Sequence, residues 1–116
     1  MIYPVDIWLR GTDYATTREI TTASEPAAWT DVDVESVLTQ MLKAMDREKN
    51  PALEERPVYL RGFSWIVNPF EEGGVVIAIE LQTGAAVAGP FAIDQRELER
   101  MVTRVMSRGR AHPGMQ

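Results

Sequence analysis

The sequence predicts a two-layer α+β fold, in which two amphipathic helices cover one face of an antiparallel sheet of four to five strands. Two segments have the spacing of amphipathic helices, and each follows a group of segments with strand character. Residues that favour turns separate neighbouring strands. A shared sheet buries the apolar side of both helices, which gives the order strand, strand, helix, then two or three strands and a second helix.

The first two strands are predicted near the N-terminus. Residues 2–9 alternate between apolar and more exposed positions, with Tyr3, Val5, Ile7 and Leu9 on one side. Pro4 favours an edge position or the start of a strand. A turn at 11–13 is followed by 16–22, a threonine-rich stretch whose β-branched side chains favour a second strand.

The clearest helix begins near Val34. Its apolar side chains recur with helical spacing and are Val34, Val37, Leu38, Met41, Leu42 and Met45. Thr30 or Asp33 can cap its N-terminus, and Asn50-Pro51 ends it. Six such side chains must face a core, because leaving them in water would cost about as much free energy as a domain's whole stability.

A hairpin is predicted next, from strands at 58–67 and 75–82 that are joined by the turn-rich segment 68–74. The bulky side chains of its first strand are Val58, Leu60 and Ile66 on one side and Tyr59, Phe63, Trp65 and Val67 on the other. Bulk on both sides indicates a central strand, or one beneath an interface. Residues 85–88 can add a short strand, which Gly89-Pro90 is expected to break.

The second helix opens with Asp94 as its N-cap and Glu97 three residues later, the pattern of a capping box. Its apolar side chains are Leu98, Met101, Val102, Val105 and Met106. We expect it to end near Ser107. Residues 1–107 then form a single α+β domain, and 108–116 form a disordered tail with nothing to pack against.

Two similar tetrapeptides, Trp8-Leu-Arg-Gly11 and Tyr59-Leu-Arg-Gly62, occur in the two halves of the chain. Each half also ends in a helix that follows an aromatic residue, Trp29 or Phe91. These similarities suggest an internal duplication.

Composition sets the class of protein. The 116 residues suit one domain, and their 45% hydrophobic and 25% charged content is ordinary for a globular protein. The absence of cysteine excludes disulfides, thiolate nucleophiles and cysteine zinc sites. The longest apolar run, 75–79, is too short for a bilayer, and no leader is evident, so we expect a cytoplasmic protein without membrane association.

Charge is distributed unevenly along the chain. The net charge is −5, but from Arg96 onward five arginines outweigh two glutamates to give +3, which leaves −8 for the rest. An acidic body repels nucleic acid, so any anionic partner is expected to approach the C-terminal end.

Few residues are suited to catalysis. The single histidine, His112, falls in the predicted tail, so no histidine-based triad or metal cluster can form in the core. Asp31, Asp33 and Glu35 lie at a helix start, where acidic residues are expected from the helix dipole alone. We therefore predict no cofactor and no metal, and a non-catalytic role is favoured over an enzyme.

Residues 61–66, Arg-Gly-Phe-Ser-Trp-Ile, resemble the start of the RNP1 motif of RNA-recognition domains, which implies stacking of bases on sheet aromatics. Ser64 and Trp65 depart from that motif, which also belongs to a different order of strands and helices. We interpret Phe63 and Trp65 as aromatic residues of a core or an interface.

A second candidate surface is a ridge of arginines. Arg96, Arg100, Arg104 and Arg108 recur every fourth residue, which aligns their guanidinium groups along one side of a helix. Such a ridge can bind phosphates or an acidic protein surface, and interleaved Glu97 and Glu99 are equally typical of a solvated helix face.

The favoured function is therefore a non-catalytic protein-interaction or homodimerising module. The alternative is an anion- or nucleic-acid-binding protein that uses the arginine ridge, and a small enzyme or ligand binder with a carboxylate-lined pocket stays open. The candidate interaction residues are Tyr59, Arg61, Phe63, Trp65, Arg96, Arg100 and Arg104.

Overall fold

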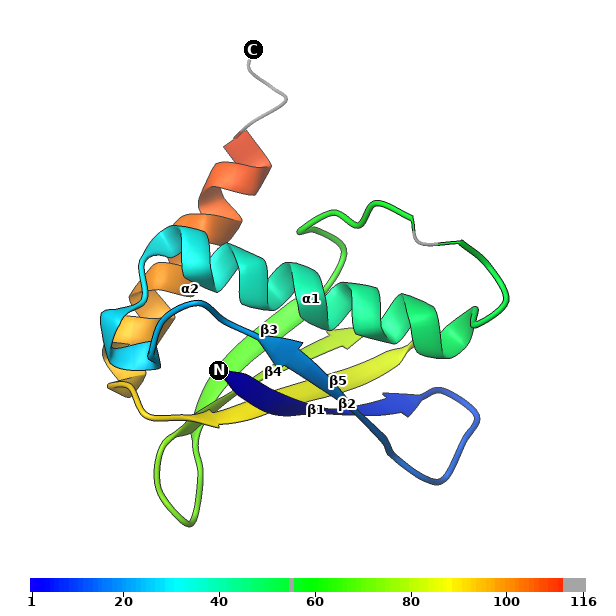
Figure 1. Ribbon diagram of the computed structural model, residues 1–116. Coiled ribbons are helices and arrows are strands. Elements are labelled where there is room, and N and C mark those ends of the chain that lie inside the picture. Colours follow the sequence, from blue (N-terminus) through cyan, green and yellow to red (C-terminus); the bar gives the residue numbers. More distant parts are fainter. Residues whose placement is uncertain (55, 112–116) are drawn as a thin grey trace.

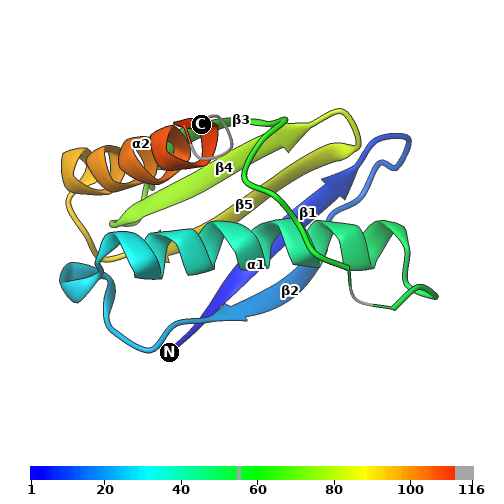
Figure 2. The same ribbon diagram turned by 90° about the horizontal axis from the view of Figure 1, so that it is seen from above.

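The computed structural model describes residues 1–54 and 56–111 and contains two layers (Figure 1). The strands are β1 (Ile2–Leu9), β2 (Thr16–Thr21), β3 (Ser64–Pro69), β4 (Val75–Leu81) and β5 (Gly84–Phe91), and the helices are η1 (Pro26–Ala28), α1 (Asp31–Lys49) and α2 (Gln95–Ala111). The strands form one sheet in the order β2-β1-β5-β4-β3, with every neighbouring pair antiparallel. Figure 2 shows both long helices lying over the same face. The predicted fold class and element order are confirmed.

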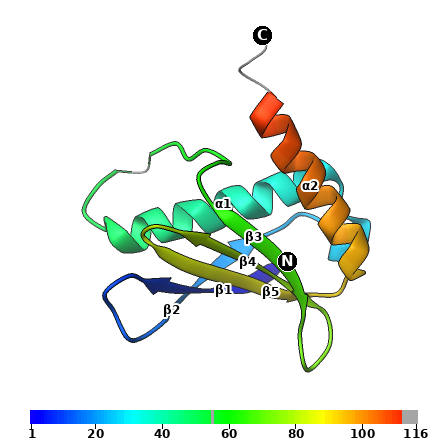
Figure 3. The same ribbon diagram turned by 180° about the vertical axis from the view of Figure 1, so that it is seen from behind.

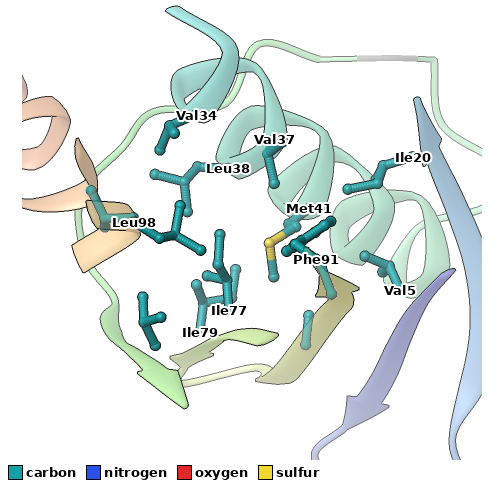
Figure 4. Close-up of a cluster of buried hydrophobic side chains, with 14 of the residues drawn as sticks. Val5, Ile20, Val34, Val37, Leu38, Met41, Ile77, Ile79, Phe91 and Leu98 are labelled. Carbon is teal, nitrogen blue, oxygen red and sulfur yellow. The ribbon is translucent and has the colours of Figure 1, made fainter. Parts of the chain in front are cut away.

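The core lies between the sheet and the two helices. Figure 4 shows Val34, Val37, Leu38 and Met41 of α1 directed toward β-strand side chains that include Ile77 and Ile79. The predicted apolar stripes of both helices are buried, from Val34 to Met45 in α1 and from Leu98 to Met106 in α2. Phe91 is fully buried, and its ring makes T-shaped contacts with the rings of Tyr3 and Trp29. The ring centroids are 4.9 Å apart in each case.

α1 begins and ends where its sequence predicts. Thr30 is the N-cap, and the Asp33 carboxylate accepts hydrogen bonds from the Thr30 backbone N–H (2.8 Å) and hydroxyl (3.1 Å). This contact fixes the chain as it enters the first turn. At the other end, the Asn50 N–H donates to the Asp46 carbonyl at 2.8 Å, and Pro51 follows.

α2 starts as predicted but is longer. The Glu97 N–H donates to Asp94 Oδ2 at 3.0 Å, so Asp94 caps the helix. The predicted end near Ser107 is wrong, because the helix continues to Ala111. Arg108, in the last turn of α2, forms an ion pair with Asp31 of α1. The sequence around Arg108 does not reveal this contact, because Asp31 is distant in the chain. The rest of the predicted tail, 112–116, lies outside the described residues.

β3 differs most from the prediction. It begins only at Ser64 and lies at the edge of the sheet, so the expectation of a central strand over 58–67 is wrong. Residues 58–63 instead form a turn-containing segment, in which the Arg61 N–H donates to the Tyr59 carbonyl at 2.8 Å and Gly62 has a φ of +78°. The bulky side chains on both sides of 58–67 have two origins. Val58 and Leu60 pack against the core from the loop, and the strand that follows has Trp65 on the covered face and Ile66 on the exposed face.

β5 is longer than predicted and is the central strand of the described sheet. The expectation that Gly89-Pro90 breaks it is wrong, because β5 continues to Phe91 and pairs with both β1 and β4. The β4–β5 pairing shifts register between Val75 and Ile77. This irregularity lets β5 continue through Gly89 and Pro90 while it stays paired with β4.

Pro4 does not mark an edge strand, because β1 lies between β2 and β5. Pairing with β5 begins only at Val5, and the Pro4 nitrogen points to that side of β1, where no ladder hydrogen bond is needed.

The two similar tetrapeptides occupy different places in the fold. Residues 8–11 lie at the end of β1, whereas 59–62 precede β3. Their shared feature is a turn glycine with positive φ, +94° at Gly11 and +78° at Gly62. A common need for a turn glycine accounts for the similarity of the two tetrapeptides without an internal duplication.

Candidate protein-interaction surface

The sheet has one covered face and one open face. Because side chains alternate along each strand, partner residues in the register share a face, and those opposite the buried set form the open one. Within the described part of the chain, no helix lies on that side (Figure 1 and Figure 3). The apolar side chains of the open face are Ile2, Pro4 and Trp8 of β1, Ala85 and Val87 of β5, Val76 and Ala78 of β4, and Ile66 of β3.

The apolar patch has a shallow centre and raised sides. In the register, Ile66 pairs with Ala78 and Ala78 pairs with Val87, so these three side chains form one row across β3, β4 and β5. Trp8 pairs with Ala85 in the adjacent row. The large side chains at the two sides are exposed, Trp8 by 41% and Ile66 by 50%, and small residues lie between them.

Polar groups border the patch. The Thr17 hydroxyl donates to Asp6 Oδ1 at 2.7 Å, which gives this carboxylate a neighbour on the open face. Glu80 and Ser64 share a pair at the β3–β4 side. At the end of β1, Arg10 Nε donates to the Gln82 carbonyl at 2.8 Å. The surface thus has an apolar centre and a polar margin, as protein interfaces do.

The predicted aromatic residues do not form this patch. Phe63 and Trp65 are half-buried against the core on the helix side, and Tyr59 is 61% exposed in the loop before β3. Arg61 lies over the Tyr59 ring, with its guanidinium carbon 5.2 Å from the ring centroid. Sequence reasoning missed Trp8, although the alternation of 2–9 already placed it opposite the core side.

The arginine ridge exists on α2 but carries its own carboxylate partners. Arg100 Nη2 lies 2.9 Å from Glu97 Oε1, and Arg104 donates to both carboxylate oxygens of Asp31, with Nε 3.0 Å from Oδ2. Arg108 pairs with the same aspartate. The hydrogen bond from Arg104 is the main cause that lowers the pKa of Asp31 below its ordinary value. Three of the four arginines therefore have a carboxylate partner, and two of them, Arg104 and Arg108, share one carboxylate.

Other chemistry finds little support in the described residues. The residues at 1–54 and 56–111 contain no cluster of three His, Cys, Asp or Glu side chains that can hold a metal ion, and His112 lies outside them. Hydrogen bonds from arginines lower the pKa of both Asp31 and Asp46. A carboxylic acid that acts as a general acid at neutral pH needs a raised pKa instead. No helix in the described part of the chain is both long enough and apolar enough to cross a membrane.

Comparisons with protein-family models, curated proteins and solved structures give no match to this chain. Its own geometry is therefore the basis for assigning a function.

Proposed function

We propose that the chain is a non-catalytic protein-interaction module that forms a homodimer through the open face of its sheet. The observation that carries this proposal is the apolar patch around Trp8 and Ile66, which the two helices leave uncovered. An exposed patch that is contiguous, rimmed by polar groups and placed on rigid strands is a typical protein-binding surface.

The size of the face fits a dimer interface. Five strands spaced at about 4.8 Å and paired over about six residues give a projected area on the order of 500 Å². Side-chain relief makes the accessible area larger than the projection, and a standard interface buries about 800 Å² on each partner. The open face is therefore large enough for a specific complex without help from other parts of the chain.

The shape of the patch favours a second copy as the partner. In a two-fold dimer, the same patch meets itself, so a raised side must face a shallow region. Trp8 on one side and the small side chains of Ala78 and Ala85 satisfy this condition, because the indole of one copy can lie over the alanines of the other. Tryptophan is also the side chain that most often dominates binding at an interface.

Solution mass tests this proposal directly. Sedimentation equilibrium over a range of concentrations should give twice the monomer mass of 13.0 kDa for the wild-type chain. Trp8→Glu should give the monomer mass, because it buries an unpaired charge in the interface. Val32→Gln is the matched control, since Val32 is exposed by 71% on α1, and α1 lies over the opposite face of the sheet (Figure 2). A wild-type chain that stays monomeric at every concentration would refute the dimer.

The arginine ridge remains the alternative proposal, as a site for phosphate groups or nucleic acid. Its ion pairs with Glu97 and Asp31 count against it, because a bound anion would need to displace them. Binding of a short single-stranded oligonucleotide that weakens steeply with salt and is lost in Arg100→Ala/Arg104→Ala would support this alternative. It would also separate the alternative from the dimer, which the double substitution leaves intact.

A further inference from the structure

A groove runs between the outer edge of β2 and the C-terminal half of α1. Its volume is about 690 Å³, within the range of protein binding sites. Thr17, Arg18 and Glu19 of β2 form one wall, and α1 forms the other together with Asn50, Leu53, Glu54 and Arg56. Ala44 lies on the α1 wall, and its small side chain leaves room between helix and strand.

The backbone of β2 faces this groove at every second residue. Met1 and Thr22 exchange two hydrogen bonds, from the N-terminal amine to the Thr22 carbonyl (2.7 Å) and from the Thr22 N–H to the Met1 carbonyl (2.9 Å), so Thr22 faces β1. The alternation of an antiparallel ladder then directs the N–H and C=O groups of Thr17, Glu19 and Thr21 away from β1. β2 is the outermost strand of the described sheet, so this side has no neighbouring strand.

The backbone of one of these residues, Thr21, is already hydrogen-bonded to the side-chain amide of Gln40. Gln40 of α1 donates from Nε2 to the Thr21 carbonyl at 2.7 Å, and its Oε1 accepts from the Thr21 N–H at 2.9 Å. This is the pair of bonds that a residue of an adjacent strand would make. Thr17 and Glu19 direct the same donor and acceptor toward the space in front of Ala44.

We infer that this groove, which we call the β2–α1 groove, binds an extended peptide segment of another protein by β-strand addition. Main-chain hydrogen bonds to Thr17 and Glu19 would hold the peptide, and its side chains would alternate between the groove and solvent. The distance from Thr17 to Thr21 corresponds to about 13 Å of strand, enough for four or five peptide residues.

The chemistry of the wall indicates what the peptide carries. The described residues line the groove with four basic side chains, Arg18, Lys43, Arg47 and Arg56, and three acidic ones, Glu19, Asp46 and Glu54. Arg18 and Arg56 form ion pairs with Glu48 and Asp46, and Arg47, one turn beyond Ala44, is exposed on the groove side of α1. A peptide with an acidic side chain beside Arg47 is therefore favoured. A second copy is a poorer occupant, because its own α1 borders its β2 on the same side and would have to enter the groove.

A random library of displayed peptides, each about ten residues long, tests this inference. We expect enriched peptides to contain Asp or Glu and to lack proline at their centre, since proline removes a main-chain donor. In ¹⁵N-resolved NMR spectra, an enriched peptide should shift the amide signals of 17–21 and of Ala44.

Two variants and a control make the test specific. Ala44→Gln fills the groove without adding charge and should weaken binding by about tenfold or more, because burial in the groove is lost. Arg47→Glu should weaken it by a few-fold, as expected for a charge at the rim. Val32→Gln changes an α1 side chain that is 71% exposed and does not line the groove, so binding should be unchanged.

A library that yields no binder, or binders that retain full affinity for Ala44→Gln, would overturn the inference. Far-UV circular dichroism would show that this variant is folded. Binders lost with Trp8→Glu but kept with Ala44→Gln would assign the peptide to the open face instead.

Discussion

At the scale of single residues, Asp31 links the two helices. It lies at the start of α1 and binds Arg104 and Arg108 of α2, which are 73 and 77 positions away in the sequence. Sequence reasoning placed Asp31 correctly as an acidic residue in a first turn and gave the arginines as a ridge. It could not join them, because nothing local shows that the N-terminus of one helix meets the side of the other.

We expect Asp31→Asn to lower Tm by about 1–4 °C at neutral pH, the range for a partly exposed ion pair. The pKa of Asp31 is lowered in the folded state, so this carboxylate stabilises the protein at pH values above its unfolded-state pKa of 3.8. The stabilisation is lost as the pH falls below 3.8 and through the folded-state pKa. The Tm difference between wild type and variant should therefore disappear in acid.

Thermal unfolding followed by circular dichroism between neutral pH and about pH 2 measures this difference. Asp13→Asn is the control, because Asp13 lies exposed in the loop between β1 and β2. It should leave Tm almost unchanged over the whole range. A Tm difference for Asp31→Asn that persists undiminished at the lowest pH would show that the carboxylate does not act through its charge.

At the scale of elements, the β4–β5 hairpin depends on the absence of a side chain at Gly84. This residue has a φ of +151°, and a Cβ placed on it would lie 2.1 Å from the Trp8 carbonyl oxygen of β1. Gly84 pairs with Leu9 at the end of the β1–β5 ladder, so the two backbones approach closely there. The sequence marks Thr83-Gly84 as a turn, but the approach of a third strand is a tertiary feature.

Gly84→Ala should destabilise the protein by on the order of 3 kcal/mol, because the added Cβ forces β1 and β5 apart. Gly11→Ala is the matched control, since Gly11 also has a positive φ, +94°, but nothing lies within 4 Å of the position that its Cβ would occupy. It should cost only about 1 kcal/mol for the backbone conformation. Urea unfolding measures both changes, and equal losses would contradict the role of the close approach.

Elements with strong local signals were predicted well, and the misplaced start of β3 has a physical cause. α1 and β1 follow from periodicity, because each has one face that must be buried. β3 was predicted too long and too central, since Val58 and Leu60 are apolar yet pack from a loop rather than a strand. Periodicity reports burial, and a loop covering the end of a core is buried in the same way.

Both edges of the sheet are partly covered by a glutamine from a helix. Gln40 of α1 binds the Thr21 backbone at the β2 edge, and Gln95 of α2 donates to the Val67 carbonyl at 3.0 Å at the β3 edge. These contacts shorten the stretch of free edge that could pair with another chain. The sequence does not reveal them, because a glutamine on a helix is ordinary unless the sheet edge beside it is known.

At the scale of the whole molecule, the fold follows from the number of apolar faces. Each helix has one apolar stripe, and one face of the sheet is enough to bury both, which is why the two-layer class was predictable. The position of the apolar surface on the second face of the sheet was harder to predict. The sequence left Phe63 and Trp65 as residues of either a core or an interface, and both pack against the core on the covered side. The pairing register decides this, because a shift of one residue between neighbouring strands exchanges the two faces.

The proposed dimer makes a thermodynamic prediction for the intact protein. Association stabilises the folded state by mass action, so the Tm of the wild-type chain should rise with protein concentration, by several degrees over about a hundredfold range. Trp8→Glu should abolish the rise, because a monomer unfolds independently of concentration. Val32→Gln should keep it, since Val32 lies on α1, over the opposite face of the sheet. Calorimetry measures all three, and a wild-type Tm that does not change with concentration would contradict the dimer.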